Sequence, residues 1–305
     1  MSDKNVLIGH CACFVAYAIF GINIITTKDL TSSHLLSPIA IFCLRSLGAG
    51  SLFWLISLFR PKEKVAPRDL PKILVASALG FFLTQMTFLM ASPIITPMSW
   101  SVVCSCTPIF TMFIAAIALK EPITGKKVSG VMISFIGIVF LILTSKTSSG
   151  GPESSSLLGY VLAILNGLSF ALYLGIFRPV IARYSVITFM KWIFLFAFLM
   201  SVPFAAGELL HFDFGSMSSR SVFELAFLIV CATFISYFLI PVGQKNIRPT
   251  LVSLYSYLQP LFAIAISISI GMDTLSVPKV LAALAVLGGV LLVNFSKSAG
   301  HHQKQ

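Results

Sequence analysis

Nine polar or aromatic side chains interrupt long apolar segments, where a hydrophobic environment cannot satisfy their hydrogen bonds. They are Asn23, Gln85, Trp100, Asn166, Tyr173, Tyr237, Tyr255, Tyr257 and Gln259. Amide and phenol groups can recognise a small solute by hydrogen bonding, and aromatic faces can hold its apolar part. Hydrogen bonds between neighbouring helices are the alternative use of such groups. We expect at least four of the nine to line a neutral, aromatic cavity.

Arg45 is the charged residue that most needs an explanation. It lies about eight residues into an apolar segment, about 12 Å along a helix, where an unpaired charge costs at least a few kcal/mol. It is either a cavity or gate residue that meets a substrate carboxylate, or a structural residue that fixes its helix against its neighbours. No acidic residue lies equally deep, which argues against a carrier driven by a simple intramembrane carboxylate.

The sequence offers no catalytic or metal-binding constellation. Cys11 and Cys13, like Cys104 and Cys106, are two residues apart, so a helix points the side chains of each pair about 200° apart. We find no Ser/His/Asp arrangement, no phosphate-binding glycine loop and no H-E-x-x-H motif. The sequence therefore disfavours an enzyme, a metal protein and an ATP-driven pump, and we expect no cofactor.

Composition places the chain in a membrane. Hydrophobic residues are 57% of the chain and charged residues 10%, against about 25% charged in a soluble domain. The mean hydropathy is +0.96. Apolar runs of about 18–24 residues can cross about 30 Å of hydrocarbon as helices. We therefore predict an all-α membrane protein with ten transmembrane helices. Their expected ranges are Val6–Thr26, Leu36–Phe59, Ile73–Ala91, Ile94–Leu119, Val128–Thr144, Leu157–Phe177, Val186–Ala206, Phe223–Ile240, Leu251–Ile270 and Val277–Phe295.

The basic residues indicate how these helices are oriented. If the amino terminus is cytoplasmic, 15 of the 21 Lys and Arg residues fall in cytoplasmic segments and four on the opposite face. This bias follows the positive-inside rule and predicts two cytoplasmic termini. The net charge of +11 is then a topology signal, and no nucleic-acid partner is expected. The first apolar run is longer than that of a signal peptide. We expect a multi-pass protein of a bacterial cytoplasmic membrane.

The second half of the chain repeats the first at a shift of 152 positions. Matched pairs include Pro97 and Pro249, Pro108 and Pro260, Glu121 and Asp273, Lys127 and Lys279, Gly137 and Gly289, and Gln85 and Tyr237. At a shift of 150, Asn23 falls on Tyr173. Five helices per half is an odd number, so the second half must enter the membrane from the opposite side. We predict two inverted five-helix repeats, residues 1–150 and 151–305, with a site between them.

The order of these motifs resembles the ten-helix EamA-type branch of the drug/metabolite transporter superfamily. The motifs that carry the resemblance are Phe20-Gly21-Ile22-Asn23, Leu44-Arg45, Thr107-Pro108-Ile109-Phe110, Lys120-Glu121-Pro122-Ile123-Thr124, Gln259-Pro260-Leu261-Phe262 and Met272-Asp273-Thr274-Leu275-Ser276. Phe20 stands where the family usually has Trp, and Met-Asp stands in the second turn where Gly-Glu is common. The resemblance covers nearly the whole chain, and these departures weaken any transfer of a substrate from a known member.

The resemblance implies that helices 1, 3, 4, 6, 8 and 9 line a central cavity, and all nine residues lie on them. The substrate-binding candidates are Asn23, Gln85, Trp100, Tyr173, Tyr237, Tyr255 and Gln259. We expect the repeat-related pairs Asn23/Tyr173 and Gln85/Tyr237 to face each other around one centre. Tyr255 and Gln259 are four residues apart and should share a helix face.

Five further candidates are expected to act in gating or structure: Arg45, Pro108, Pro260, Glu121 and Asp273. An arginine at this place in a family with different substrates favours the structural role of Arg45. Pro108 and Pro260 break or bend helices 4 and 9 in matched places, which suits either rocking or a static bend. Glu121 and Asp273 are expected to anchor tight turns by favouring the positive end of the next helix.

Together these features predict a secondary transporter that moves a small organic metabolite by alternating access. A neutral, aromatic cavity suits an amino acid or another zwitterionic or amphipathic solute. The alternative is a membrane-embedded lipid-handling protein, either a scramblase or an enzyme. The expected partners are a small-molecule solute and the lipid bilayer. The substrate, the direction of transport, the coupling ion and the choice between monomer and homodimer stay open.

Overall fold

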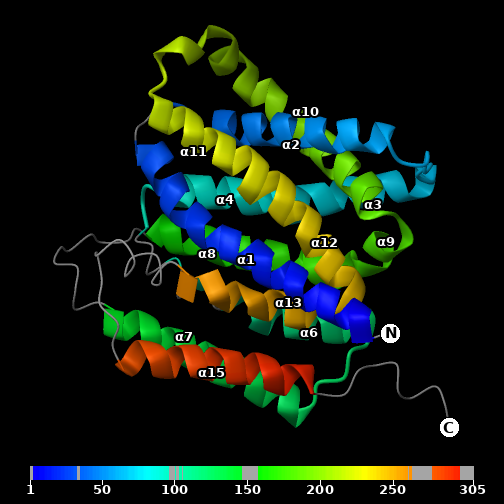
Figure 1. The fold of residues 1–305 in the computed structure, drawn as a ribbon, viewed down its shortest axis with the longest axis vertical. Coiled ribbons are helices and arrows are strands. Elements are labelled where there is room, and N and C mark those ends of the chain that lie inside the picture. The colour runs from blue at the N-terminus through cyan, green and yellow to red at the C-terminus, as the bar shows by residue number, and fades with distance from the viewer. Residues whose placement is uncertain are drawn as a thin grey trace.

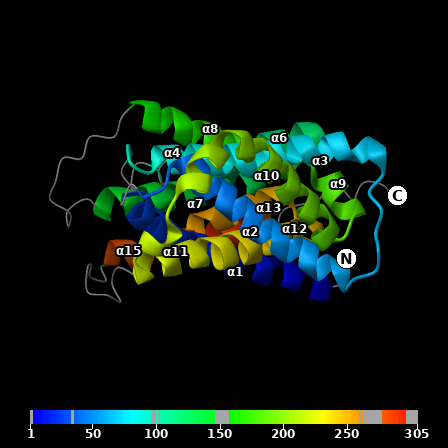
Figure 2. The ribbon, with the colours of Figure 1, turned by 90° about the horizontal axis from the view of Figure 1, so that it is seen from above.

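The described part of the chain is helical throughout. The computed structural model describes residues 3–32, 35–95, 100, 103–104, 106–145, 157–259, 261–262 and 277–295, and these contain no strand. Figure 1 shows the helices packed side by side along a common direction, and Figure 2 shows them from above. The α-helices are α1 (Asp3–Ser32), α2 (Pro38–Leu58), α3 (Leu70–Ser77), α4 (Thr84–Ala91), α6 (Thr107–Leu119), α7 (Gly125–Ser145), α8 (Leu157–Ile176), α9 (Arg178–Arg183), α10 (Val186–His211), α11 (Ser219–Ile229), α12 (Ser236–Asn246), α13 (Pro249–Leu254) and α15 (Val277–Asn294).

Five short segments of other helix types complete the described elements. The 3-10 turns are η1 (Pro67–Asp69), η4 (Phe214–Ser216) and η6 (Tyr255–Tyr257), and the π-helical segments are η2 (Ala78–Leu83) and η5 (Val230–Ile235). Because η2 joins α3 to α4 and η5 joins α11 to α12, each of these helix pairs forms one continuous rod.

Six helices of the described residues are long and apolar enough to cross a membrane. They cover Lys4–Thr27, Pro38–Leu58, Pro67–Ala91, Leu157–Ile176, Val186–His211 and Ser219–Asn246. Their outer faces expose large apolar side chains, such as Leu210 at 83% and Phe204 at 74%. A soluble protein of this size rarely exposes so much apolar surface, whereas lipid covers it at no cost. The prediction of an all-α membrane protein is confirmed, and the count of ten spans stays a prediction.

The antiparallel helices α2 and α10 are fastened at both ends by the same device. Ser37 precedes α2, and its backbone N–H and hydroxyl both donate to Glu208, near the end of α10; the N–H to Oε1 distance is 2.7 Å. Ser185 precedes α10, and its N–H and hydroxyl both donate to Glu63, beyond the end of α2; the hydroxyl distance is 2.6 Å. Each serine also caps its own helix. We call these contacts the two serine–glutamate clasps.

Helices α7 and α15 form a second antiparallel pair of repeat-related elements, seen at the bottom of Figure 1. The Ser134 hydroxyl donates to the Val286 carbonyl at 3.1 Å, and these residues lie 152 positions apart. Gly130 lies against Val293 and the Gly289 carbonyl, so a side chain larger than hydrogen does not fit at either glycine. Small residues allow two membrane helices to approach closely, and here they set the spacing of the pair.

Replacing Gly289 by alanine should lower the melting temperature of the purified protein by several degrees. The added Cβ would lie well under 3.0 Å from the Ser134 hydroxyl and the Gly130 carbonyl, and backbone cannot yield as a flexible side chain can. Gly288→Ala is the matched control, because a Cβ at Gly288 meets nothing within 4 Å. Equal melting temperatures for the two variants would show that α7 and α15 do not pack as described.

The two π-helical segments occupy repeat-related positions, since η2 begins at residue 78 and η5 at residue 230. A π segment widens the helix and shifts the faces of the residues that follow it. Thr233 and Ser236 fit this geometry, because their hydroxyls donate to carbonyls five residues earlier. Gly80 allows the Tyr173 ring of α8 to pack directly on the η2 backbone. Both deviations from the α-helix lie beside the central cavity described next.

Candidate functional site

A partly open cavity lies at the centre of the bundle. About 100 Å³ of it is available to the centres of water molecules, several times the space that one water needs. It is lined by Tyr17, Phe20, Asn23, Ile24, Thr84, Gln85, Phe88, Trp100, Cys104, Thr107, Asn166, Phe170, Tyr237, Ser256, Tyr257 and Gln259. These residues come from all six segments that the resemblance implied and from both halves of the chain. The cavity is therefore built between the repeats.

Five of the seven substrate-binding candidates line this cavity: Asn23, Gln85, Trp100, Tyr237 and Gln259. Of the other polar residues noted in the sequence, Asn166 and Tyr257 also line it. Tyr173 and Tyr255 do not. The binding role of the five stays a prediction, but the fold brings them into one space.

Gln85 and Tyr237 meet across the cavity as the repeat predicted. The Gln85 Nε2 donates to the Tyr237 hydroxyl at 2.7 Å, and the two residues lie 152 positions apart. Gln85 lies on α4 and Tyr237 on α12, each just after a π-helical segment. Both side chains are buried, at 8% and 5% exposure. This hydrogen bond joins repeat-related residues of the two halves in the wall of the cavity.

Three cavity-lining polar atoms have no hydrogen-bond partner among the described residues: the Tyr17 hydroxyl, Gln85 Oε1 and the Ser256 hydroxyl. A buried polar group left without a partner costs about 1–3 kcal/mol. Such groups are rare in a folded protein unless water or a ligand satisfies them. Tyr17 and Ser256 can donate and the Gln85 oxygen can accept, so the cavity offers both kinds of contact to a bound solute.

Other polar groups in the wall serve the helices themselves. The Asn166 amide donates to the Thr84 carbonyl at 2.5 Å and to the Thr87 hydroxyl at 3.2 Å, which joins α8 to α4. The Asn23 oxygen accepts from the Thr27 hydroxyl at 3.1 Å within α1. The Thr84 carbonyl, at the start of α4, also accepts from the Thr87 hydroxyl at 3.0 Å. Asn166 therefore acts as a contact between helices, the alternative use of such residues.

Tyr173 and Tyr255 have other surroundings than expected. Tyr173 is 3% exposed and packs against Gly80 and the Phe170 ring, so it does not face Asn23 across the cavity. The Tyr255 hydroxyl meets His10 Nδ1 at 2.7 Å. Gln259 lines the cavity and Tyr255 does not, and the 3-10 turn η6 begins at Tyr255 and precedes Gln259. The three residues per turn of a 3-10 helix rotate the chain further per residue than an α-helix does.

Aromatic rings form much of the remaining wall. Phe20 packs edge-on against Tyr17 and Tyr237, with ring centroids 5.7 and 5.8 Å apart. Trp100 packs against Phe88 at 5.2 Å. The lining contains no carboxylate, lysine, arginine or histidine among the described residues. A cavity of amides, hydroxyls and aromatic faces can hold a small solute that has both an apolar body and hydrogen-bonding groups.

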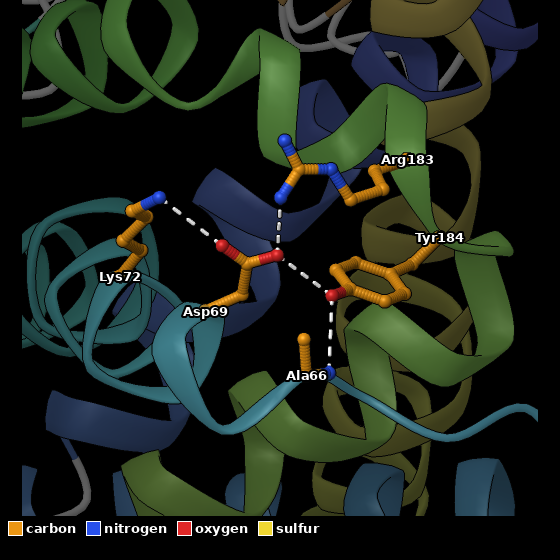
Figure 3. A network of polar contacts seen from close by, with 5 residues as sticks. All are labelled: Ala66, Asp69, Lys72, Arg183 and Tyr184. Atoms are coloured by element: carbon orange, nitrogen blue, oxygen red, sulfur yellow. Dashed lines mark hydrogen bonds and ion pairs between the residues drawn. The ribbon is translucent and has the colours of Figure 1, made fainter.

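A polar network lies at the end of the bundle at which α1 begins and α9 lies, on the right of Figure 1. Figure 3 shows its centre, the buried carboxylate of Asp69 at the start of α3. Asp69 accepts from Arg183, from the Tyr184 hydroxyl at 2.7 Å and from Lys72 at 3.1 Å. The Tyr184 hydroxyl also accepts from the Ala66 N–H at 3.2 Å. We call these five residues the Asp69 network.

Two further contacts bind the same end. Lys245, near the end of α12, donates to the Tyr184 carbonyl. Partial burial raises the pKa of Glu63, but hydrogen bonds from Ser185 and Thr188 and the charge of Lys245 outweigh it, so its pKa lies below the ordinary value. The Glu63 clasp therefore stabilises the fold above the unfolded-state pKa of this carboxyl. That contribution is lost as the pH falls through the lower, folded-state pKa.

Glu121 anchors the turn after α6 through ion pairs rather than by capping the next helix. It is 6% exposed, and its Oε2 accepts from Lys127 at 2.6 Å. Arg178 of α9 lies 3.8 Å from its Oε1. Lys120 adopts the left-handed conformation, with φ of 53°, that ends α6. The hydroxyl of Thr124 accepts the Lys127 N–H instead.

The remaining gating candidates have different outcomes. Pro108 is the second residue of α6, where its missing N–H costs nothing. Residues 103 and 104 before it are also helical and Cys106 lies in a turn, so the gating role of a break at this place stays a prediction. Pro260 and Asp273 lie outside the described residues. Arg45 is fully buried in α2 and donates from Nε to the Thr233 hydroxyl at 2.8 Å.

Sequence reasoning missed Tyr17, Thr84 and Ser256 in the cavity wall. A helical signal for Tyr17 existed, because it stands three residues before Phe20 and seven before Ile24 on one face of α1. Thr and Ser gave no signal, since their hydroxyls can bond within their own helix. The Asp69 network was also missed, because its members lie about 115 positions apart in two segments that read as loops.

Comparisons with known proteins agree with this geometry. The model of the EamA-like transporter family matches the chain twice, at residues 7–143 and 157–295. An uncharacterized transporter of Archaeoglobus fulgidus is 28% identical over 68% of this chain and 70% of its own length. The uncharacterized inner membrane transporter YicL of Salmonella typhimurium is 24% identical over 74% of each chain.

The fold also matches a solved structure. A protein crystal structure superposes with a TM-score of 0.74 over 96% of both chains, at 16% identity, which supports the fold alone. Two copies of one family unit, apolar helices and relatives described as transporters identify a membrane transporter. The chain belongs to the EamA-like transporter family.

Proposed function

We propose that this protein is a secondary transporter that moves a small organic metabolite by alternating access, with the central cavity as its binding site. The observation that carries the proposal is the cavity itself. Both halves of the chain line it, the repeat-related pair Gln85 and Tyr237 meets in it, and three buried polar atoms in its wall have no partner among the described residues. A site between repeats is where such carriers bind their solutes.

Two inverted five-helix repeats, residues 1–150 and 151–305, fit the packing. Repeat-related helices run antiparallel in two pairs, α2 with α10 and α7 with α15. The clasps at Ser37 and Ser185 and the two π segments are further matched features. A pseudo-two-fold axis in the membrane plane relates elements in this way, and it requires an odd number of spans per half. We therefore retain ten spans, with both termini cytoplasmic.

The described conformation suits the outward-facing state of such a cycle. The Asp69 network and Glu121 tie together the α9 end, which carries the basic loops and is the cytoplasmic end in this topology. The cavity lies away from that end, because α4 contributes its wall residues after η2 and Trp100 comes from before α6. Rocking of the two halves would break the contacts at the α9 end and close the outer side.

Counterflow in proteoliposomes tests the proposal. Vesicles preloaded with one of a panel of amino acids, organic acids, nucleosides, sugars or organic cations should accumulate the labelled form of the transported solute against its gradient. Gln85→Ala should reduce the initial rate by roughly ten-fold or more, because it removes two polar contacts of about 1 kcal/mol or more each. The folded fraction should not fall.

Two outcomes would contradict transport. One is that no solute of any charge class exchanges while the purified protein is folded. The other is that labelled lipid crosses the bilayer without any solute exchange, which would favour the lipid-handling alternative.

A further inference from the structure

Arg45 is a fully buried, positively charged residue of α2. It is the eighth residue of α2, and no part of its side chain is exposed. A charge in this position is costly in a membrane unless an anion or water compensates it. The compensation must come from the groups that surround the guanidinium.

Within the described part of the chain, only one of the three guanidinium nitrogens of Arg45 has a hydrogen-bond partner. Nε donates to the Thr233 hydroxyl at 2.8 Å, and that hydroxyl in turn donates to the Leu228 carbonyl of α11. Nη1 and Nη2 have no hydrogen-bond partner among the described residues. Thr233 therefore fixes the back of the guanidinium, while the two Nη groups present an unused fork of N–H donors.

The described part of the chain brings no counter-ion to this fork. Its ion pairs join Asp69, Glu121 and Glu224 to lysines or arginines near helix ends, and none includes Arg45. Leaving a buried charge uncompensated costs several kcal/mol. Among the described residues, no negative group compensates the guanidinium.

Arg45 is not one of the residues that line the cavity, but its hydrogen-bond partner Thr233 lies on a rod that contributes to the lining. Thr233, which holds its Nε, stands four residues before Tyr237 in the same rod. Tyr237 lines the cavity. Because Arg45 is fully buried and does not line the cavity, a bound solute can meet the fork only if side chains of the wall move.

We propose that Arg45 anchors a carboxylate of the transported solute, so that the carrier takes small organic acids or zwitterions with an apolar body and excludes organic cations. The two Nη groups match the two oxygens of a carboxylate in a bidentate pair. Such charge-assisted hydrogen bonds are stronger than hydrogen bonds between neutral groups. The rings of Phe20 and Phe88 then hold the apolar body. The inference rests on the proposed function, since it names the substrate class of the same cavity.

Paired probes test the charge requirement on purified full-length protein. Thermal stabilisation is measured with phenylacetate against phenylacetamide, with L-phenylalanine against L-phenylalaninamide, and with aliphatic organic acids against their amides. We expect the carboxylate of a pair to raise the melting temperature and its amide not to do so. Stabilisation by phenylacetate indicates that the carboxylate suffices, and stabilisation by phenylalanine alone indicates a zwitterion site. No stabilisation by any carboxylate, or equal stabilisation by the amides, overturns the proposal.

Arg45→Met distinguishes a binding role of Arg45 from a structural role. Without solute, its melting temperature should equal or exceed that of the wild type, because the variant removes a buried cation that lacks a counter-ion. Its apparent Kd for the stabilising carboxylate should rise roughly 100-fold or more, since two charge-assisted hydrogen bonds are lost. Arg45→Lys keeps the charge but lacks the fork of N–H donors, so its apparent Kd should lie between those of the wild type and Arg45→Met. Arg60→Met, the same change at an exposed loop residue, should alter neither quantity.

The contrary results are distinct. If Arg45→Met melts several degrees lower and binds carboxylates as the wild type does, Arg45 is a structural residue. If the variant still exchanges a cationic or neutral solute at the wild-type rate, the substrate class is wrong but the transport function stands. If neither protein exchanges any solute, the proposed function itself fails.

Discussion

Tyr237→Phe should lower the rate of solute exchange roughly 10- to 100-fold while the protein stays folded. The change removes one oxygen and leaves the ring in place, so the packing against Phe20 and Phe81 is retained. Gln85 then loses its one described hydrogen-bond partner, although its oxygen already has none. A buried amide with neither group satisfied costs about 1–3 kcal/mol, which converts to this range of rates. Initial rates of counterflow at several solute concentrations measure the effect.

Tyr173→Phe is the matched control for this prediction. Tyr173 is as buried as Tyr237 and belongs to the same bundle, but it does not line the cavity. Removing the Tyr173 hydroxyl should change the rate of solute exchange by less than about two-fold. If the two variants lost activity equally, or if Tyr237→Phe had the kinetics of the wild type, the cavity would not be the binding site.

Asp69→Asn should shift the carrier toward an opening at the α9 end by roughly ten-fold. The carboxylate is fully buried and joins η1 to Arg183 and Tyr184, which connect α9 to α10. Asparagine keeps the shape but loses the charge that balances Arg183. We expect a loss of about 1–2 kcal/mol rather than the full value for a buried ion pair, because Arg183 can reach water. Cysteine accessibility from the cytoplasmic side of membrane vesicles reports the shift.

Lys72→Gln separates this effect from a general loss of surface charge. Lys72 also pairs with Asp69, but its side chain is 53% exposed and the pair lies within one helical turn. Such exposed pairs contribute little, so we expect less than a two-fold change. Equal shifts in the two variants would mean that the Asp69 network does not hold the α9 end closed.

Part of the cavity wall could be predicted from the sequence, because polar residues within apolar helices are few and stand out. Gln85 and Tyr237 are polar residues in apolar runs, and their repeat-related spacing carried over into a contact. The helices themselves followed from long apolar segments, whose hydrogen bonds must close within the segment in lipid. The fold class and the meeting of Gln85 with Tyr237 are therefore the parts that hydrophobicity and repetition predicted, and the substrate-binding role of these residues stays a prediction.

The parts that failed depend on tertiary contacts that no local pattern encodes. Gln259 lines the cavity and Tyr255 does not, with the 3-10 turn η6 beginning at Tyr255, and a change of helix type leaves no signature in residue spacing. The π segment before Thr84 is of the same kind. The serine–glutamate clasps and the Asp69 network join segments more than 100 positions apart, so only the packed bundle brings their partners together.

The most direct test of a central, alternately exposed binding site uses Cys104, a native cysteine in the cavity wall. A variant that keeps this cysteine and replaces the other five is labelled with a membrane-impermeant thiol reagent, separately from each side of the membrane. We predict modification from the outer side, slowed by the transported solute and not by a solute that is not exchanged. Asp69→Asn should increase modification from the cytoplasmic side. Modification that is equal from both sides and indifferent to the solute would contradict the account.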